Sequence, residues 1–397
     1  MIKTTIEESC TLHARIGWQG LTKSEYLEDG DYYLITGVDF DNGRIAFEKC
    51  HYVTKDRYDQ DPHIQIKDKD VLVTKDGTIG KVAYIDKETD KPATLNSGVF
   101  VVRPKNPTVL LPQYLRVVLL SNHFTRFIEQ IKVGCTIAHL NQEKFLKYTF
   151  PLPSTSEQER IIEITNKMHS LIECRKQQLS TFDTLIKARF VEMFGDMLIN
   201  PMYWPEQRLE TVAEIVSGIT KGRKIQTTEL NDVPYMAVSN VKDGYIDWTT
   251  VKTIAATQAE IDQYRLLPDD VLMTEGGDPD KLGRGAIIHN PPKDCIHQNH
   301  IFRVRLNQEH VLPEFMEQYL QHPRAKMYFL GCAKQTTGIA SINMTQLRAL
   351  PMLIPPMGLQ KQFAVFVSQI DKSKSIIQQA LAKDQLLFDS LMQKYFG

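Results

Sequence analysis

The sequence has little that would place the protein in a membrane or outside the cell. Its first ten residues, MIKTTIEESC, contain no basic start followed by an apolar core, so we expect no signal peptide. The longest apolar stretch, around Val109 to Leu120, is interrupted by Pro112, Gln113 and Arg116 and is too short and polar to span a bilayer. The six cysteines are scattered and form no CxxC pair, which is typical of reduced thiols. We therefore expect a cytoplasmic protein.

An excess of positive charge is also missing. Lysine and arginine number 47, aspartate and glutamate 48, and the net charge is −1. A protein that coats nucleic acid without sequence preference is usually strongly basic, so DNA binding here would need local patches or a basic partner. The 397 residues, 42% of them hydrophobic, are enough for two or three domains with buried cores.

No catalytic motif is convincing, because GxSxG, HExxH and P-loop patterns are all absent. The Asn-Pro-Pro-Lys run at 290–293 resembles the loop in which adenine methyltransferases stack an aromatic side chain on a flipped base, but Lys293 replaces the aromatic residue. No Gly-rich cofactor loop accompanies this run in the sequence, so we interpret the run as a proline-rich turn. Pro268, Asp269 and Glu275 resemble a nuclease pattern without its spaced lysine, and we interpret them as loop residues.

One cluster could bind a metal. Cys295, His297 and His300 are ligand types that zinc accepts, but no fourth ligand is evident nearby. The ordinary interpretation, buried or surface side chains with hydrogen-bond partners, is favoured, and we predict no metal in this chain.

The two halves of the sequence resemble each other at a spacing of about 200 residues. Five short segments recur in the same order: Val71–Thr74 with Val271–Thr274, Gly80–Ala83 with Gly283–Ala286, Leu111–Tyr114 with Leu312–Phe315, Ile137–Asn141 with Ile339–Asn343, and Phe194-Gly195 with Phe396-Gly397. Five ordered matches predict an internal repeat.

Each repeat has two parts. The first is strand-rich, with short β-prone runs separated by Gly, Asp or Asn. In the first repeat these are 33–35, 70–74, 81–85 and 99–103, and in the second 235–238, 271–274, 286–288 and 301–306. One helix opened by proline is expected in each, at Leu111–Ile131 and at Leu312–Leu330. The first part is thus a mixed α/β domain.

The second part of each repeat is one long helix. In the first repeat it follows Pro151-Leu152-Pro153-Ser154, with a possible capping box at Ser156–Glu159, and continues for about 38 residues to Gly195. Apolar residues recur at helical spacing: Ile161, Ile164, Met168, Leu171 or Ile172, Leu179, Phe182, Leu185 or Ile186, Phe190 and Phe194. The second helix follows Pro355-Pro356 with the stripe Leu359, Phe363, Phe366, Ile370, Ile377, Leu381, Phe388, Leu391 and Tyr395. Because either stripe alone would face water, we expect the helices to pair.

The central helix carries a resemblance to a known family. From Glu157 to Asp196 it reads EQERIIEITNKMHSLIECRKQQLSTFDTLIKARFVEMFGD, which resembles the central spacer of type I restriction–modification specificity subunits. The run Tyr235–Val241 followed by Asp243–Ile246 is similar to the start of a recognition domain. The second spacer departs from the pattern, with Leu359–Phe363 reading LQKQF where the first spacer has EQERI.

The resemblance implies an α+β protein with two target-recognition domains and long helices that pair as an antiparallel coiled coil, related by a pseudo-twofold repeat. The expected boundaries are 1–153 and 197–355 for the domains, and 154–196 and 356–397 for the spacer helices. It further implies that each domain reads half of a bipartite site on double-stranded DNA, while the helices set the gap and dock two methyltransferase subunits. Those subunits would use S-adenosylmethionine to methylate adenine N6, and motor-nuclease subunits using ATP and Mg²⁺ would join for restriction. This chain itself would be non-catalytic and hold no cofactor.

Two other classes remain open. An enzyme fused to a helix would bind cofactor as a purified chain, and a coiled-coil scaffold would leave its complex indifferent to DNA sequence.

Polar loop residues at matching places in both repeats are the candidate DNA contacts, because side chains read base edges while lysine and arginine bind phosphate. There are three groups, each given as residues of the first repeat and their counterparts in the second. They are Arg15, Trp18, Gln19 and Lys23 with Thr220, Lys221, Arg223 and Lys224; Lys75 and Lys81 with Lys281 and Arg284; and Lys132 and Thr136 with Lys334, Gln335 and Thr336.

Overall fold

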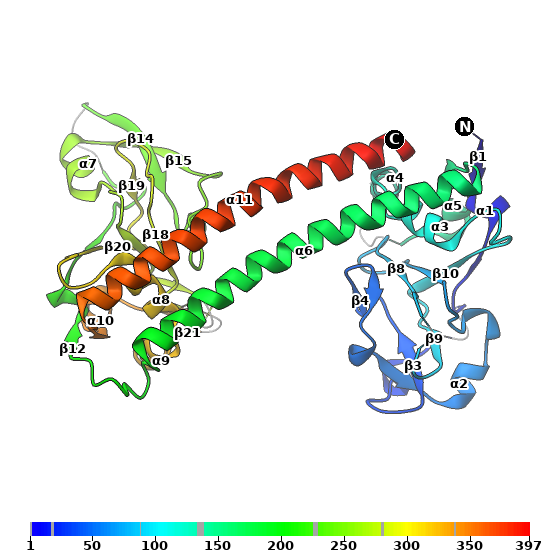
Figure 1. The fold of residues 1–397 in the computed structure, drawn as a ribbon, viewed down its shortest axis with the longest axis horizontal. Helices are drawn as coiled ribbons and strands as arrows, with labels where there is room; N and C mark the ends of the chain where they lie inside the picture. Colours follow the sequence, from blue (N-terminus) through cyan, green and yellow to red (C-terminus); the bar gives the residue numbers. More distant parts are fainter. Residues whose placement is uncertain are drawn as a thin grey trace. The chain divides into compact units, whose positions relative to one another are not determined.

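The computed structural model describes residues 2–16, 20–87, 89–132, 139–224, 229–278, 282–336 and 339–397. The chain forms two compact units (Figure 1). Unit 1 comprises Met1–Lys176 with Gln378–Gly397, and unit 2 comprises Gln177–Ile377. Each unit therefore contains one domain and parts of both long helices.

The main sheet of unit 1 has four antiparallel strands in the order β2-β10-β7-β8. They are β2 (Cys10–His13), β10 (Val99–Pro104), β7 (Val71–Thr74) and β8 (Val82–Tyr84). Alternate side chains of a strand point to opposite faces. Val71 and Val73 accordingly join the core under two helices, α3 (Pro112–Leu119) and α4 (Asn122–Lys132), while Leu72 joins the core on the other face. Burial on both faces explains why VLVT is apolar throughout.

A second sheet covers that other face. Its order is β6-β3-β9, with β3 antiparallel to β6 and parallel to β9. Smaller pairs are β1 with β11 and β4 with β5, and short helices complete the described part of the domain. The bounds are β1 (Lys3–Thr5), α1 (Ile6–Ser9), β3 (Tyr32–Ile35), β4 (Phe40–Asp41), β5 (Arg44–Ile45), β6 (His51–Val53), α2 (Lys55–Asp59), β9 (Ala93–Leu95), α5 (Gln142–Leu146) and β11 (Thr149–Pro151).

Unit 2 repeats this topology. Its main sheet has the order β13-β20-β16-β18 and its second sheet the order β15-β14-β19, so the same strands of each repeat pair in the same directions. The bounds are β12 (Glu206–Arg208), β13 (Ala213–Ser217), β14 (Asn231–Met236), β15 (Lys252–Ala256), α7 (Gln258–Tyr264), β16 (Val271–Thr274), β18 (Gly285–Ile287), β19 (Ile296–His297), β20 (Ile301–Leu306), α8 (Pro313–Gln321), α9 (Pro323–Cys332), α10 (Met344–Arg348) and β23 (Pro351–Leu353). The predicted internal repeat is confirmed.

A buried ion pair explains one of the repeated motifs. Asp70 accepts two hydrogen bonds from Arg103, at 2.6 and 2.7 Å, and Asp270 accepts two from Arg305, both at 2.8 Å. Both aspartates are almost fully buried, where an unpaired charge is strongly unfavourable. The recurring acidic residue before each VLVT or VLMT strand, Asp70 or Asp270, is therefore structural.

The two long helices are α6 (Thr155–Phe194) and α11 (Met357–Phe396). In unit 1 the early residue Ile161 of α6 shares a core with Met392 and Phe396 of α11. In unit 2 the late residues Phe190 and Phe194 of α6 share a core with early residues of α11 that include Phe363 and Val367. The helices therefore pair antiparallel, which confirms the expected α+β fold class with two domains and long helices.

The stripe prediction was ambiguous at two positions, and the structure resolves both. Ile172 and Ile186 are the buried residues, whereas Leu171 and Leu185 are 40% and 43% exposed. The predicted capping box at Ser156 is wrong, because Ser156 lies inside α6. Ser154 is the cap, and its hydroxyl accepts the Glu157 backbone N–H at 3.4 Å.

The single helices expected at 111–131 and 312–330 are each two helices. In unit 1 the break is at Ser121, whose hydroxyl donates to the Val118 carbonyl at 2.6 Å and accepts the Phe124 N–H at 3.3 Å. In unit 2 the break precedes Pro323, which has no N–H and forces His322 into an extended conformation. Within the described ranges, no helix has the length and apolar character required to cross a membrane.

Candidate nucleic-acid interface

The sheet topology of unit 1 gathers the predicted loops at one edge. Val99, at the start of β10, pairs with Thr74, at the end of β7, and Val101 pairs with His13, at the end of β2. The loop after β2, the β7–β8 turn and the loop before β10 therefore leave the main sheet on the same side. The chain near His139 joins them, because the Leu140 N–H donates to the Lys75 carbonyl at 2.8 Å. We call these four segments the loop edge.

Unit 2 has the same loop edge. Ser217 and Thr274 end β13 and β16 beside the start of β20, where they pair with Phe302 and Ile301. After β16, β17 (Gly276–Gly277) pairs with β22 (Ile339–Ser341), and β22 pairs with β21 (Lys334–Thr336). Gly276–Gly277 of the β16–β18 turn and the predicted loop group 334–336 are thus connected through one small sheet.

The backbone hydrogen bonds of the two loop edges are equivalent. The Lys75 N–H donates to the Gly98 carbonyl at 2.8 Å, and the Glu275 N–H donates to the His300 carbonyl at 3.0 Å. Likewise, the Leu140 N–H donates to the Lys75 carbonyl at 2.8 Å, and the Ile342 N–H donates to the Glu275 carbonyl at 2.9 Å.

The side chains on this shared frame differ. Lys75 of unit 1 corresponds to Glu275 of unit 2, Gly98 corresponds to His300, and His139 corresponds to Ser341. Each loop edge therefore presents a different set of charges and hydrogen-bonding groups from the same backbone positions.

Glycines allow the β-turn of each loop edge to pack closely on the domain. Gly80 has φ +82°, and a Cβ there would lie 2.8 Å from the Ile128 side chain. Gly283 has φ +69°, and a Cβ there would lie 2.3 Å from the Phe329 ring. Thr74 braces the first turn, donating to the Thr78 carbonyl at 2.6 Å and accepting the Lys81 N–H at 2.9 Å. The Gly-rich sequence therefore fixes the turn.

Most of the described candidates are accessible. Exposed residues are Lys23, Lys81, Lys132, Thr220, Lys221 and Lys224. Lys75 is half-buried, with its ammonium 5.2 Å from the centre of the Phe100 ring, and Arg284 is also half-buried. Trp18, Gln19, Thr136 and Lys281 lie outside the described residues, and for Lys334, Gln335 and Thr336 the structure describes only the strand β21.

Arg15 is a correction, because it is 1% exposed. Its guanidinium donates to the Leu95 carbonyl at 2.9 Å, to Gln60 at 3.1 Å, and to the Arg57 carbonyl and the Thr94 hydroxyl at 3.3 Å each. Burial also lowers the pKa of this guanidinium. A side chain this occupied inside the domain is not placed to contact DNA.

Arg223 is a second correction. Its guanidinium binds both carboxylate oxygens of Glu260, at 2.5 and 2.6 Å, and donates to the Ala255 carbonyl at 3.0 Å. The Arg223 hydrogen bonds lower the pKa of Glu260 to about 2. Arg223 therefore braces α7 against the loop after β13, and the exposed neighbour Lys224 is the better candidate contact.

Sequence reasoning missed the acid–histidine pairs of the loop edges. His139 Nδ1 pairs with Asp76, and His300 Nδ1 lies 2.5 Å from the Glu275 carboxylate. The search favoured basic residues at matching positions, so acidic residues and unmatched histidines were passed over. Comparing what differs between the repeated loops would have found all four.

Cys295, His297 and His300, which were considered as metal ligands, are held by other partners. Cys295 and His297 are fully buried, and His297 lies within hydrogen-bond distance of the Tyr264 and Val216 carbonyls, at 3.2 and 3.4 Å. His300 points elsewhere, to Glu275. Among the described residues, no group of three His, Cys, Asp or Glu side chains could hold a metal ion.

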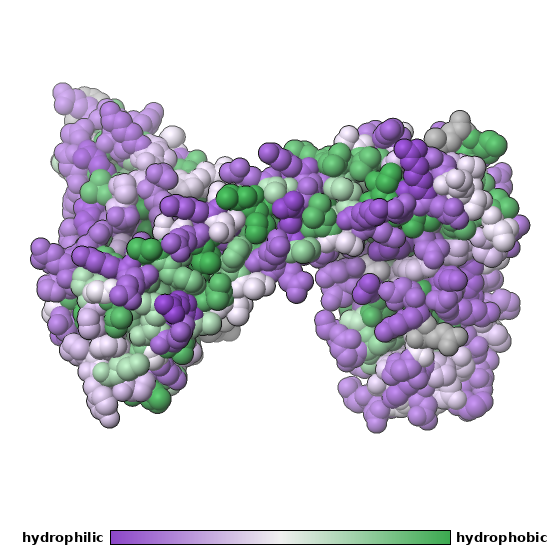
Figure 2. Space-filling model, in the orientation of Figure 1, coloured by the Kyte–Doolittle hydropathy of each residue, from purple (hydrophilic) through white to green (hydrophobic). Residues whose placement is uncertain are grey.

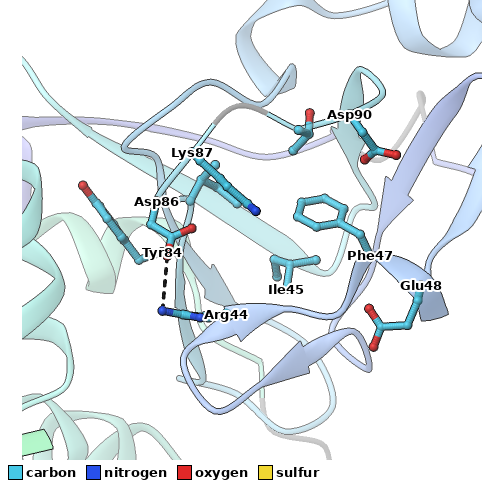
Figure 3. A pocket seen from close by; sticks show the side chains of 10 residues that line it. Arg44, Ile45, Phe47, Glu48, Tyr84, Asp86, Lys87 and Asp90 are labelled. Carbon is cyan, nitrogen blue, oxygen red and sulfur yellow. Dashed lines mark ion pairs between the residues drawn. The ribbon is translucent and has the colours of Figure 1, made fainter. Parts of the chain in front are cut away.

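A depression in unit 1 has a mixed lining (Figure 3). Its volume is about 540 Å³. Figure 3 shows Arg44 facing Asp86, a pair that lies 3.3 Å apart, with Ile45 and Phe47 on the wall beside them. Because Arg44 and Asp86 already pair with each other and the remaining charged residues of the lining carry both signs, this depression is a weaker binding candidate than the loop edges.

The fold and its loop edges define a class of protein in which one chain presents two similar sheet edges, each on a domain joined to paired long helices. Comparison with known families agrees. The type I restriction modification DNA specificity domain matches the chain twice, at residues 18–181 and 201–383, and the chain belongs to this family.

Individual relatives are distant in sequence but extend over most of the chain. The EcoKI specificity subunit of Escherichia coli (strain K12), from a type I restriction enzyme, is 21% identical over 393 residues, covering 94% of this chain and 83% of the relative. The StySPI specificity subunit of Salmonella potsdam is 20% identical over 387 residues with the same coverage.

Solved structures show the same fold. The S subunit of a type I system from M. genitalium aligns with a TM-score of 0.57 and 15% identity, covering 100% of this chain and 96% of that chain. A chain from a study of complex assembly and conformational transition of the type I R-M system aligns with a TM-score of 0.56 and 16% identity, covering 99% and 97%.

Proposed function

We propose that this chain is the DNA sequence-specificity subunit of a type I restriction–modification complex, and that each unit reads one half of a bipartite site on double-stranded DNA. The observation that carries the proposal is the loop edge, built twice on equivalent backbone hydrogen bonds with different side chains. A chain that recognises two different half-sites with two similar domains must place the same backbone frame against both half-sites and make different side-chain contacts in each.

The side chains suit base reading. In the major groove a lysine donates to guanine, while a carboxylate accepts from the cytosine amino group. Unit 1 presents Lys75 and exposed Lys81, whereas unit 2 presents Glu275 beside His300. The two half-sites therefore differ in base sequence, and exposed Lys221 and Lys224 supply phosphate contacts to the second.

The long helices suit partner docking. Large apolar side chains stand exposed on them, among them Leu386 at 70%, Ile376 at 68% and Val365 at 60%. Figure 2 shows apolar residues among hydrophilic ones on the helical part of the surface. Methyltransferase subunits cover these residues in the complex, and motor-nuclease subunits join for restriction.

The chain acts in this complex as the non-catalytic component. S-adenosylmethionine belongs to the methyltransferase subunits, which methylate adenine N6, and ATP with Mg²⁺ belongs to the motor-nuclease subunits. A net charge of −1 is reasonable for a subunit whose partners share the DNA contacts.

The test exchanges side chains between the two loop edges. The double variant Glu275→Lys/His300→Gly places unit 1 side chains on the unit 2 frame, and is expressed with the cognate methyltransferase subunit in a host whose methylome is sequenced. We expect altered preference in one half-site and an unchanged second half-site. Glu309→Lys, the same charge change at an exposed position outside the loop edge, is the control and should leave the methylated site unchanged.

Loss of preference in both half-sites, or an unchanged site in an active double variant, contradicts the assignment. Methyl transfer by the purified chain alone contradicts the non-catalytic role.

A further inference from the structure

Both loop edges hold an imidazole ring against a carboxylate. In unit 1, Nδ1 of His139 pairs with Asp76, and in unit 2, Nδ1 of His300 lies 2.5 Å from the Glu275 carboxylate. The partners are 63 and 25 residues apart in the sequence, so the folded loop edge brings each pair together. Both rings stay accessible, since 51% of the His139 side chain and 57% of the His300 side chain are exposed. We call these the loop-edge histidine pairs.

The two pairs arise at different positions of the shared backbone frame. In unit 1, Asp76 forms a backbone β-bridge with His139, whereas Gly276 and Ser341 occupy the corresponding positions of unit 2. The pair of unit 2 instead comes from the residue before Gly276 and the residue before β20. Repetition of the sequence therefore does not account for the presence of a pair in both units.

Glycines separate the two arrangements. Gly98 of unit 1 occupies the place of His300, and a Cβ at Gly98 would lie 3.5 Å from Cβ and 3.6 Å from Oδ2 of Asp76. A larger side chain at position 98 would therefore compete with the Asp76 carboxylate for space. In unit 2, a Cβ at Gly276 would lie 3.0 Å from the Ala340 carbonyl oxygen, which is closer than Cβ atoms normally approach. Each loop edge thus fits one arrangement of the pair and disfavours the other.

The buried ion pairs of the two domains behave differently. Asp70 and Asp270 make their bidentate pairs with arginine at equivalent positions of the two units, as expected of a contact that stabilises the fold. The loop-edge histidine pairs recur as a chemical group and not as a pair of positions. Because their rings also remain at the surface, this is the pattern expected of side chains that contact a ligand.

The carboxylate decides what each ring offers to a ligand. A carboxylate acceptor keeps the proton on Nδ1 and fixes the orientation of the ring. The second ring nitrogen, Nε2, is then a hydrogen-bond acceptor in the neutral imidazole. Among the described residues, Nε2 of His139 and Nε2 of His300 have no hydrogen-bond partner. In the major groove of DNA, the exocyclic amino groups of adenine and cytosine are the groups that donate to such an acceptor.

We propose that His139 and His300 are base-reading residues, each of which accepts a hydrogen bond at Nε2 from the amino group of one adenine or cytosine. Asp76 and Glu275 are the residues that position the two rings. In unit 2 the side chain of Glu275 is 33% exposed and that of His300 57%, so the ring is better placed to reach DNA. This inference rests on the proposed reading of DNA by the loop edges, and it assigns the reading residues and the base chemistry that they recognise.

The test pairs each histidine with one base. The complex of this chain with its cognate methyltransferase subunit is titrated with duplexes that contain its site, as identified by methylome sequencing, and binding is followed by fluorescence anisotropy. At each adenine and cytosine of the site in turn, 2-aminopurine or 2-pyrimidinone removes the major-groove amino group. We expect one position at which this removal weakens binding by the wild-type chain about threefold to tenfold, as for one neutral hydrogen bond, but does not weaken binding by His139→Ala. His300→Ala should be insensitive in the same way at one position of the other half-site.

The matched control is His63→Ala. His63 is an exposed histidine of unit 1 whose Nδ1 lies 3.2 Å from Asp61, outside the loop edge, and its removal should leave the sensitivity at every position unchanged. Asp76→Ala should remove the sensitivity at the same base as His139→Ala, because the ring is no longer oriented. Asp76→Asn, whose amide oxygen can accept the same hydrogen bond, should retain it. The same duplexes serve all variants, so effects of the analogues on base pairing cancel.

Equal sensitivity of the wild-type chain, His139→Ala and His300→Ala at every adenine and cytosine overturns the inference, even if a variant binds all duplexes more weakly. If Glu275→Lys/His300→Gly nevertheless alters one half-site, the loop edges still read DNA and only the role of the histidines is wrong. If no loop-edge variant alters either half-site, the proposed function fails as well. A histidine variant that is instead insensitive to 7-deazaguanine, which lacks the N7 acceptor, would show that Nε2 donates and would contradict the assignment.

Discussion

A buried glutamine fixes each long helix to its domain in the same way. Gln158 of α6 is fully buried, accepts the Leu111 N–H at 2.9 Å, and donates to the Val109 and Pro153 carbonyls at 2.8 and 2.9 Å. Gln360 of α11 makes the same three hydrogen bonds, to Leu312, His310 and Pro355, at 2.9, 2.9 and 2.8 Å. Glutamine is the one residue that EQERI and LQKQF share at the same position, and the structure buries it completely in both helices.

We predict that Gln158→Leu destabilises unit 1 by about 3 kcal/mol. The substitution keeps the volume but leaves one N–H and two carbonyls without partners, and each such buried group costs at least about 1 kcal/mol. This is a large part of the 5–15 kcal/mol that typically stabilises a domain. In hydrogen exchange, the Leu111 amide should exchange about a hundredfold faster, since about 1.4 kcal/mol corresponds to a factor of ten.

Gln360→Leu should produce the same effect at Leu312 in unit 2 and leave Leu111 protected. The control is Gln178→Leu, the same substitution at an exposed position of α6, which should leave both amides protected. If Gln158→Leu and Gln178→Leu give equal urea midpoints and equal Leu111 exchange, the glutamine is not what joins helix to domain.

Three further results are expected. Inserting four residues beside Gln178 and four beside Gln379 should lengthen the gap of unspecified bases between the two half-sites of the methylated sequence and leave both half-sites unchanged, because each residue adds about 1.5 Å of helix. An unchanged gap in an active variant would show that the helices do not set this distance. Asp270→Asn should cost about 1–3 kcal/mol in urea denaturation, because the neutral amide cannot accept both hydrogen bonds that the buried Asp270 carboxylate accepts from Arg305, and an unchanged urea midpoint would contradict the pair. Burial lowers the pKa of His297 from 6.5 to about 4, so between these pH values the unfolded state binds more protons than the folded state. The free energy of unfolding should therefore fall by about 3 kcal/mol in total as the pH drops from 6.5 to 4. His297→Phe should flatten the pH dependence of the urea midpoint in this range, and an unchanged slope would contradict burial of the ring.

The repeated strands Val71–Thr74 and Val271–Thr274 were readable from the sequence because they are buried. Val71–Thr74 and Val271–Thr274 are central strands with apolar neighbours on both faces, and such positions accept few residue types. The helix stripes were readable for the same reason, since 3.6-residue periodicity reflects one buried face. The breaks at Ser121 and before Pro323 were not, because each pair of short helices continues one apolar pattern across the break.

The site was predicted less well because loop residues give no periodic signal. Arg15 follows an alternating strand and looks like an exposed loop cation, yet it is buried by partners 42 to 80 residues away in the sequence. Arg223 similarly depends on Glu260, 37 residues away. Only the folded chain brings these partners together, so sequence alone placed both residues at the interface.

A comparison of the two units separates residues that stabilise the fold from residues that are candidates for DNA contacts. The buried polar contacts recur almost unchanged: the bidentate pairs of Asp70 and Asp270, and the hydrogen bonds of Gln158 and Gln360. The side chains that the loop edges present on the same frame do not recur, since half-buried Lys75 is replaced by half-buried Glu275. A buried group that loses its partner costs stability in either unit, whereas an exposed loop side chain is nearly neutral for folding. Loop-edge positions are therefore free to change with the DNA sequence that each half must read, while the frame that presents them is constrained to stay the same.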